Sequence, residues 1–324
     1  MSTFGFETTG DEIAAICSNA IRGKVVLITG PSCGSLGAAF AETIAPHGPS
    51  LIILASRDTS KLEPVVAAIK SIAPTVATRV LKLDLASQEK IREAASEVNN
   101  YDDVPHIDVL INSSGIMAVP YSQTTDGIEL QFGVNHLGHF LFTNLIINKL
   151  VSADGSRKSR VVNVSSNGHE LSRVRFEDWN FEHGPYNRWY AYGQSKSANM
   201  LFSISLAARF ANKGLISVSL HPGVIRTNLS SHLEEAAWPE LAEIGRNLAL
   251  TKFRSFNAKS QQQGVATYVF AAFHDFISMH VNGRYLEDSQ VLDLEEYKCW
   301  GRDPTDAERL WTLSERLVRQ EFRY

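Results

Sequence analysis

Cysteine is scarce in this chain of 324 residues: Cys17, Cys33 and Cys299 are the only three, and no two of them form a Cys-x-x-Cys pair. A disulfide framework or a cysteine-rich metal site needs more cysteines at closer spacing. Three dispersed cysteines are typical of a protein from a reducing compartment. We therefore expect neither disulfides nor a metal site.

Long apolar runs and long basic runs are also missing. The longest apolar stretches, at residues 51–55 and 140–147, fall far short of the ~18 residues that a membrane helix needs. Glu7, Asp11 and Glu12 precede only a short apolar stretch, which is unlike a signal or transit peptide. The 31 basic and 35 acidic residues give a net charge of −4, and no basic run could follow a phosphate backbone. The sequence predicts a cytoplasmic protein with no membrane span and no nucleic-acid partner.

Internal repeats, low-complexity tracts and flexible linkers are absent, so nothing divides the chain into several large domains. Its content of 44% apolar and 20% charged residues suits one sizeable α/β core. We expect a helical extension at 1–22, the core at 23–290 with a substrate-binding helical insert at 231–263, and a helical tail at 291–324. Asp303-Pro304 is a candidate start for the helix of that tail.

Short β-branched runs alternate with longer helical patterns along the core, which is the sequence form of repeated βαβ units. This alternation predicts a Rossmann-like, doubly wound parallel sheet of about seven strands with helices on both faces. The expected strands are 24–29, 50–55, 78–82, 109–111, 160–164, 216–220 and 283–286. The expected helices are 36–45, 60–72, 88–98, 128–150 and 192–211.

The first expected strand runs into Thr29-Gly-Pro-Ser-Cys-Gly-Ser-Leu-Gly37 and then an alanine-rich helix. Glycines permit a tight turn and close backbone approach, and a helix N-terminus offers N–H groups to a pyrophosphate. This order predicts a dinucleotide site, although an ordinary glycine-rich turn would look similar. The candidate cofactor-binding residues of the loop are Gly30, Ser32, Gly34, Leu36 and Gly37.

Arg57 follows the second expected strand, where an NAD enzyme often carries a carboxylate for the ribose 2′-hydroxyl. A guanidinium there favours a 2′-phosphate, and hence NADP(H), with NAD(H) as the alternative. Asp58 beside it weakens this preference, and Arg57 could also be a solvated loop residue.

Tyr192-Gly-Gln-Ser-Lys196 sets a phenol and an ammonium one helical turn apart on one face. A neighbouring cation stabilises a phenolate and lowers the pKa of the phenol, so this pair could exchange a proton with a carbonyl or an alcohol. The alternative is a solvated surface pair.

Together these residues resemble the short-chain dehydrogenase/reductase superfamily over about residues 23–290. The resemblance is strongest to its retinol-dehydrogenase-like branch, through Val162-Asn-Val-Ser-Ser-x-Gly-His and Asn282-Gly-Arg-Tyr-Leu-Glu287, and extends to fungal members of secondary metabolism. Two departures are an extra residue between Gly34 and Gly37, and Ser113-Ser114 in place of Asn-Ala. By motif position, the resemblance assigns catalytic roles to Asn135, Ser166, Tyr192 and Lys196, and Tyr192 and Lys196 would also contact the cofactor. It assigns further cofactor contacts to Asp84, Leu85, Asn112, Ser114, Gly115, Pro222, Gly223, Val224 and Thr227.

The resemblance implies an NADP(H)-dependent oxidoreductase that interconverts a ketone and a secondary alcohol on a lipophilic small molecule. In this scheme Tyr192 is the general acid/base, Lys196 holds the nicotinamide ribose and lowers the phenol pKa, and Ser166 binds the substrate oxygen. Asn135 would hold a water linked to Lys196. The alternatives are non-redox chemistry on the same scaffold, such as epimerisation, dehydration or cyclisation, and a non-catalytic dinucleotide-binding protein. The family also implies a homodimer or homotetramer paired through the helices at 128–150 and 192–211, unless a terminal extension blocks that face.

Several assignments stay open from the sequence alone. Ser165 could replace Ser166 if the strand register differs, although alternation favours Ser166. His136 and His139 could suggest a metal pair but lack an accompanying carboxylate motif, so we interpret both as structural. The aromatic segment 173–190 is expected to line or cover the substrate pocket, and Trp238 suits either core or pocket.

Overall fold

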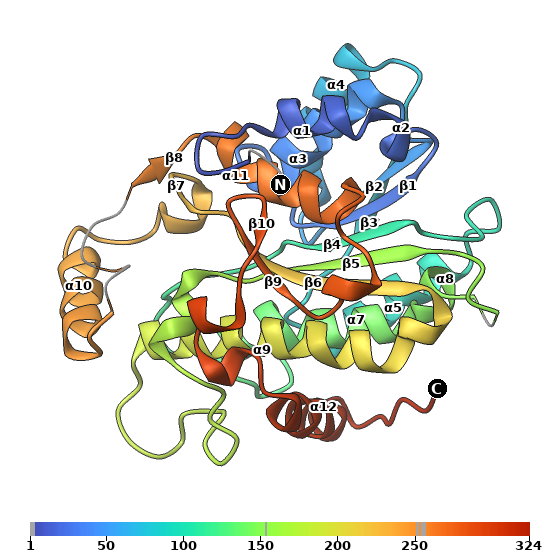
Figure 1. Cartoon of the computed structure of the whole chain (residues 1–324). Coiled ribbons are helices and arrows are strands. Elements are labelled where there is room, and N and C mark those ends of the chain that lie inside the picture. Colours follow the sequence, from blue (N-terminus) through green and yellow to red (C-terminus); the bar gives the residue numbers. More distant parts are fainter. Residues whose placement is uncertain (1–3, 153, 251–252, 254–256) are drawn as a thin grey trace.

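The computed structural model describes residues 4–152, 154–250, 253 and 257–324. Its central feature is an eight-stranded sheet in the order β10-β9-β6-β5-β4-β1-β2-β3 (Figure 1). Neighbouring strands run parallel except β10, which pairs antiparallel with β9. The strands are β1 (Val25–Thr29), β2 (Leu51–Ser56), β3 (Ala77–Lys82), β4 (Val109–Asn112), β5 (Ser159–Val164), β6 (Leu215–His221), β9 (Tyr285–Glu287) and β10 (Gln290–Val291).

Helices cover both faces of this sheet, as parallel strands joined by crossovers require (Figure 1). One face carries α1 (Gly10–Ile16), α2 (Ser18–Ile21), α3 (Leu36–Ile44), α4 (Glu63–Ile72) and α11 (Gln261–Phe273). The other carries α5 (Gln88–Asn99), α6 (Leu130–Phe132), α7 (Gly138–Leu145), α8 (Ile147–Leu150), α9 (Arg188–Phe210) and α12 (Pro304–Val318).

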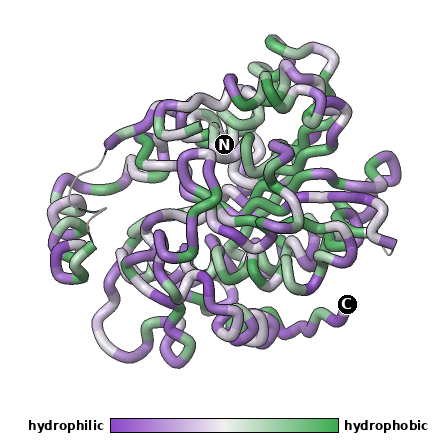
Figure 2. The backbone as a smooth tube through the Cα atoms, viewed as in Figure 1, coloured by the Kyte–Doolittle hydropathy of each residue, from purple (hydrophilic) through white to green (hydrophobic). Residues whose placement is uncertain are grey.

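Alternation along each strand divides the apolar core into two layers. Val26 and Ile28 of β1 pack with the α3 and α11 layer, whereas Leu27 between them packs with the α7 and α9 layer. All three side chains are fully buried. Figure 2 shows the same arrangement as hydrophobic colour gathered along the central strands. The predicted doubly wound fold is thus confirmed, with eight strands rather than about seven.

The expected helix at 128–150 is broken into several pieces in the structure. A π-helical turn, Gly133–Leu137, separates α6 from α7, and α8 follows as a short final turn. A π-helical turn adds a residue to the helical repeat, and such turns occur frequently at functional sites. Asn135 lies in the middle of this one.

The N-terminal extension forms two short helices rather than the single expected one. Thr9 caps α1, since its hydroxyl accepts a hydrogen bond from the Glu12 N–H while the Glu12 carboxylate accepts one from the Thr9 N–H. Ile13 and Ala14 are buried against α3 and α11. Residues 1–3 lie outside the described part.

The expected insert at 231–263 contains α10 (Ala237–Asn247) and β8 (Ala258–Lys259), which pairs with β7 (Val224–Ile225). Its last three residues already belong to α11. Residues 251–252 and 254–256 of this insert are outside the described residues. At the C-terminus, Asp303 caps α12 as the sequence predicted. None of the described helices is long and apolar enough to cross a lipid bilayer.

Candidate active site

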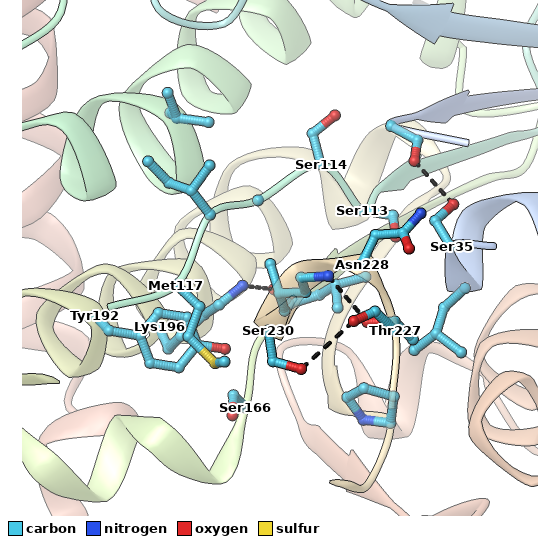
Figure 3. Close-up of a pocket in the computed structure, with 18 of the residues that line it drawn as sticks. Ser35, Ser113, Ser114, Met117, Ser166, Tyr192, Lys196, Thr227, Asn228 and Ser230 are labelled. Carbon is cyan, nitrogen blue, oxygen red and sulfur yellow. Dashed lines mark hydrogen bonds between the residues drawn. The ribbon is translucent and has the colours of Figure 1, made fainter. Parts of the chain in front are cut away.

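A cavity of about 800 Å³ opens where the carboxyl ends of the parallel strands meet. Its walls come from the segments that follow β1, β2, β3, β4, β5 and β6, which is where open α/β sheets bind ligands. Figure 3 shows Tyr192, Lys196 and Ser166 gathered on one side, and Ser35 and Ser114 on the other. This size is within the usual range for pockets that bind cofactors and small molecules.

The glycine loop presses its backbone against the loop after β4. Gly30 has a φ of 73°, and a Cβ at this position would lie 2.8 Å from the Ser114 Cα. Only glycine fits both the conformation and the close approach. Ser35, which belongs to the two-residue spacer between Gly34 and Gly37, caps α3: its hydroxyl accepts from the Ala38 N–H at 3.2 Å and donates to the Gly30 carbonyl at 3.1 Å. The extra residue is thus accommodated at the helix start.

Most of the predicted cofactor-binding residues line the cavity. Those that do are Gly30, Ser32, Leu36, Arg57, Asp84, Leu85, Ser114, Gly115, Tyr192, Lys196, Pro222, Gly223, Val224 and Thr227.

Gly34, Gly37 and Asn112 do not line it. Gly34 has a φ of 77° and supports the loop, and a Cβ on Gly37 would lie 3.1 Å from the Pro31 Cα. The Asn112 amide points into the interior, where it donates to the Asn163 Oδ1 at 2.8 Å. These three residues shape the site from behind the cavity wall.

The end of the cavity beside β2 is basic. Arg57 lines it together with Lys61, which the sequence analysis did not single out. The Asp58 carboxylate is turned toward the backbone, where it accepts from the Ser60 hydroxyl at 2.6 Å and the Ser60 N–H at 3.2 Å. Asp58 thus caps the helical turn that follows it through one carboxylate oxygen. It also lines the cavity, and its other oxygen lies 4.0 Å from the Lys61 Nζ.

Ser166, Tyr192 and Lys196 meet on one wall of the cavity. The Ser166 hydroxyl and the Tyr192 phenol lie on the same wall, and the Lys196 Nζ lies 5.5 Å from the centre of the Tyr192 ring. Gly168 makes this packing possible, because a Cβ on Gly168 would lie 2.6 Å from the Tyr192 ring. The Ser165 hydroxyl instead donates to the Lys196 carbonyl at 2.8 Å, so it is Ser166 that faces the phenol.

Burial controls the protonation of this pair. It raises the pKa of Tyr192 to about 12, although the nearby Ser166 hydroxyl lowers this pKa in part. It also lowers the pKa of Lys196 to about 8, because the buried ammonium has little water around it. We expected the lysine to lower the phenol pKa from its ordinary value; the shift is in the opposite direction because desolvation is the larger effect.

Asn135 lies behind the cavity wall and is fully buried. Its Oδ1 accepts from the Ile116 N–H at 2.8 Å, and its Nδ2 donates to the Ile116 carbonyl and to the Ser195 hydroxyl, both at 2.9 Å. Both amide hydrogens are thus used by the protein. Gly115 separates the Asn135 side chain from the cavity. A Cβ on Gly115 would lie 3.2 Å from the Asn135 Oδ1 and 3.7 Å from the Lys196 Nζ.

One wall of the cavity is apolar: Met117, Leu171, Trp189, Leu241 and Phe253 line the cavity and pack into one cluster. The expectation that residues 173–190 form this wall was wrong for most of that segment, since Trp189 is its one member among the lining residues. Trp179 and Phe176 instead pack against the α7 and α9 core. Further apolar residues that line the cavity include Leu130, Val134, Leu229 and Trp238.

The two histidines of α7 and its preceding turn point to different places. The His136 Nε2 is hydrogen-bonded to the Ser314 hydroxyl of α12 at 2.9 Å, and the His139 Nε2 to the Thr29 hydroxyl at 2.9 Å. Within the described part of the chain, no cluster of three metal-ligating side chains is present.

Sequence comparison identifies the family. The model described as "short chain dehydrogenase" matches residues 24–238. The chain belongs to the short-chain dehydrogenase family. It is 35% identical to retinol dehydrogenase 11 of Homo sapiens over 303 residues, which cover 93% of this chain and 88% of that protein. It is 37% identical to retinol dehydrogenase 14 of Mus musculus, over 92% of this chain and 86% of that protein.

Solved structures of short-chain dehydrogenases share the fold. An uncharacterized protein from Mycobacterium paratuberculosis is 33% identical with a TM-score of 0.70, over 94% of this chain and 96% of that one. Carbonyl reductase from chicken fatty liver, solved with bound NADPH, is 18% identical with a TM-score of 0.60, over 84% of this chain and 99% of that one. The predicted likeness to the retinol-dehydrogenase-like branch is confirmed, and the likeness to fungal members stays a prediction.

Proposed function

We propose that this short-chain dehydrogenase is an NADP(H)-dependent oxidoreductase that interconverts a carbonyl and an alcohol on a lipophilic small molecule. The observation that carries the proposal is that Ser166, Tyr192 and Lys196 share one wall of the cavity into which the glycine loop opens. Tyr192 would donate its proton to the carbonyl oxygen during reduction and remove it from the alcohol during oxidation. Ser166 would hold the same oxygen. Lys196 would supply the positive charge beside the phenol.

The cavity suits a dinucleotide. The backbone approach at Gly30 and the N-terminus of α3 offer room and N–H groups for a pyrophosphate. Arg57 and Lys61 suit a 2′-phosphate, and these two cations outnumber the single Asp58 carboxylate beside them. The hydrogen bond from Ser60 lowers the pKa of Asp58, so this carboxylate keeps its negative charge. When bound, the nicotinamide would supply or accept the hydride, which is chemistry that no side chain performs.

The apolar end of the cavity supports a lipophilic substrate. Trp189, Trp238 and Phe253 give the cavity large hydrophobic surfaces, and Trp189 lies three residues before Tyr192 on α9. We expect ketones and secondary alcohols as substrates. Because the relatives are named retinol dehydrogenases, isoprenoid alcohols and aldehydes are further candidate substrates.

Replacing Tyr192→Phe tests the proposal, because it removes the hydroxyl and keeps the ring. We expect the variant to bind NADPH as the parent does, by fluorescence titration, and to lose at least about a thousandfold in kcat for NADPH oxidation at 340 nm with a panel of hydrophobic ketones and aldehydes. Tyr190→Phe is the matched control, since Tyr190 precedes Tyr192 on α9 and does not line the cavity.

Each result separates the candidate functions. Full turnover by Tyr192→Phe would refute the phenol as the proton donor. Tight NADPH binding with product formation but no net change in NADPH would favour non-redox chemistry instead. Binding without any chemistry across the panel would favour a dinucleotide-binding protein.

A further inference from the structure

His139 is a buried histidine that connects two parts of the site. It lies on α7, four residues after Asn135, and its side chain is 2% exposed. Its Nδ1 is 3.0 Å from the Asn135 carbonyl oxygen, and its Nε2 is 2.9 Å from the Thr29 hydroxyl. Thr29 ends β1 and begins the glycine loop. A single ring therefore joins the cofactor loop to the π-helical turn beside Lys196.

The hydrogen bonds allow one arrangement of protons. A carbonyl oxygen can only accept, so the Nδ1 of His139 carries the hydrogen. The Thr29 hydroxyl oxygen already accepts from the N–H groups of Ser113 and Ser114, both at 3.0 Å. With its two lone pairs used, the hydroxyl can only donate. The bare Nε2 at 2.9 Å is a closer acceptor than the Ile111 carbonyl at 3.4 Å, so the hydroxyl donates to the Nε2. The ring is thus held as a neutral imidazole with a fixed tautomer.

Burial favours the same neutral form. It lowers the pKa of His139 to about 4, and the nearby Lys196 charge acts in the same direction, although the hydrogen bond to Asn135 opposes both. The ring therefore keeps one protonation state over the working range of pH.

The hydrogen bonds of His139 connect Thr29, next to the cofactor loop, with Asn135, behind the wall that carries Tyr192 and Lys196. At one end, Thr29 fixes the backbone of Ser113 and Ser114, which line the cavity beside Gly30. At the other end, the Asn135 carbonyl belongs to a residue whose side chain is also fixed, through Ser195, to the Tyr192 carbonyl. This carbonyl belongs to the π-helical turn, where the His139 ring holds it with a side-chain hydrogen bond.

We propose that His139 is a positioning residue of the oxidoreductase site: its Nδ1–H fixes the Asn135 carbonyl in the π-helical turn behind the cavity wall, and its Nε2 holds the Thr29 hydroxyl in the cofactor loop. The inference rests on the proposed function, which supplies the reaction to be measured. It predicts that the two ring nitrogens serve different steps. Nδ1 acts on the chemical step, and Nε2 acts on cofactor binding.

Two substitutions separate these roles. His139→Asn keeps a donor for the carbonyl four residues earlier, as Asn144 does in the same helix, where its Nδ2 donates to the Phe140 carbonyl at 2.8 Å. It removes the acceptor for Thr29. His139→Gln places its amide farther out, toward Thr29, and removes the donor to Asn135.

We expect His139→Asn to keep kcat within about threefold of the parent while its KM and Kd for NADPH rise about tenfold. We expect His139→Gln to keep its NADPH affinity while kcat falls by about one to two orders of magnitude. The proposal is overturned if both variants lose kcat equally, or if neither changes either constant.

His136→Gln is the matched control. His136 is three residues away, is equally buried, and is hydrogen-bonded to Ser314 of α12 instead of to the site. We expect its kcat and its NADPH affinity to match those of the parent. If His136→Gln reduces kcat as much as His139→Gln does, the effect belongs to packing in general and the proposal fails.

Two further measurements cover the case in which a histidine variant does not fold. Thr29→Val removes the hydroxyl and should weaken NADPH binding with little change in kcat; unchanged NADPH binding would overturn the Thr29 half of the link. In the parent protein, labelled with ¹⁵N-histidine, the His139 resonances should show the proton on Nδ1 at about pH 7. A proton on Nε2 would overturn the link directly.

The proposed function and this inference can fail separately. Turnover by Tyr192→Phe refutes the function whatever His139 does. Normal turnover by the parent together with silent His139 variants refutes the inference alone. If no substrate is turned over, the NADPH titrations of His139→Asn and His139→Gln still test the cofactor half of the link.

Discussion

Lys196 is the buried cation of the site, and its environment sets the pH range in which it is charged. Its Nζ donates to the Val164 carbonyl at 3.0 Å, and burial lowers its pKa from 10.5 to about 8. The ammonium is therefore present below about pH 8 and is lost as pH rises through that value. Tyr192, with a pKa of about 12, keeps its proton over the same range.

Carbonyl reduction should follow the charge on Lys196. We expect kcat/KM for reduction to be level from about pH 6 to about pH 7.5 and to fall above about pH 8, as the cation beside the phenol disappears. Lys196→Arg should be less active but should lack this fall, since a guanidinium stays charged. Activity that stays level to about pH 10 in the parent would contradict the role of the charge.

Arg57 is the side chain on which the choice between NADPH and NADH is predicted to depend. Arg57→Asp replaces attraction with repulsion at the basic end of the cavity, so the Kd for NADPH should rise about a hundredfold while the Kd for NADH changes by less than about threefold. Lys61→Ala should act in the same direction with a smaller effect.

Lys82→Asp controls for the change in net charge. Lys82 ends β3 next to Ser56 of β2, is exposed and does not line the cavity. We expect fluorescence titrations of this variant to match the parent for both cofactors. Equal weakening of NADPH and NADH by Arg57→Asp would exclude a 2′-phosphate contact.

At the scale of elements, the turn at Pro222-Gly223, between β6 and β7, is supported by Lys259, a buried lysine of β8. The Lys259 side chain is 1% exposed, its Nζ is paired with Asp288, and its ammonium lies 4.9 Å from the Phe6 ring. A Cβ on Gly223 would lie 2.6 Å from the Lys259 Cδ, so the lysine stem packs directly under the turn. Asp288 is held at a φ of 53°, in the left-handed region.

Breaking this pair should destabilise the turn. Lys259→Met leaves the Asp288 carboxylate without its cation, and we expect the free energy of unfolding to fall by about 2 kcal/mol in urea titrations. The double variant Lys259→Met/Asp288→Asn should recover part of that loss, because it also removes the Asp288 carboxylate charge that the first substitution leaves without a partner. If the double variant is less stable than the single one by the full effect of Asp288→Asn, the two side chains act independently.

The pattern of apolar and polar residues along the chain predicted the helices and strands that bury one face. It missed the elements whose structure depends on contacts with distant parts of the chain. Helix α11 was not predicted because it is buried on every side from Gly264 to Phe273, which removes the polar and apolar periodicity of a surface helix. The two-residue strand β10 exists through its pairing with β9. The π-helical turn at Asn135 likewise has no local signature.

The same distinction holds for the site. Ser166, Tyr192 and Lys196 were found because their spacing and motifs are fixed along the chain. Lys61 and Trp238 reach the cavity only through the placement of their helices, and the chain pattern could not reveal this. His139 was interpreted as a structural histidine because its partners, Thr29 and Asn135, are brought to it by the fold.

At the scale of the whole molecule, the C-terminal helix lies on α7 and α9, on the opposite side of the sheet from the N-terminal helices (Figure 1). The Trp311 ring lies 4.9 Å from the Phe140 ring, and the Arg209 guanidinium stacks over Trp311 at 4.0 Å. The chain then continues to Tyr324, whose hydroxyl donates to the Asn144 Oδ1 at 2.9 Å. The family resemblance assigned subunit pairing to this helical face.

The C-terminal segment should therefore prevent pairing through α7 and α9. We expect light scattering at micromolar concentration to give the 35.8 kDa of one chain. Trp311→Ala should lower the free energy of unfolding by about 3 kcal/mol, because it opens a cavity against Phe140, and it should raise the fraction of dimer as α12 loosens. A stable dimer of the parent whose mass is unaffected by Trp311→Ala would place the interface on another face, and would contradict the protective role of α12.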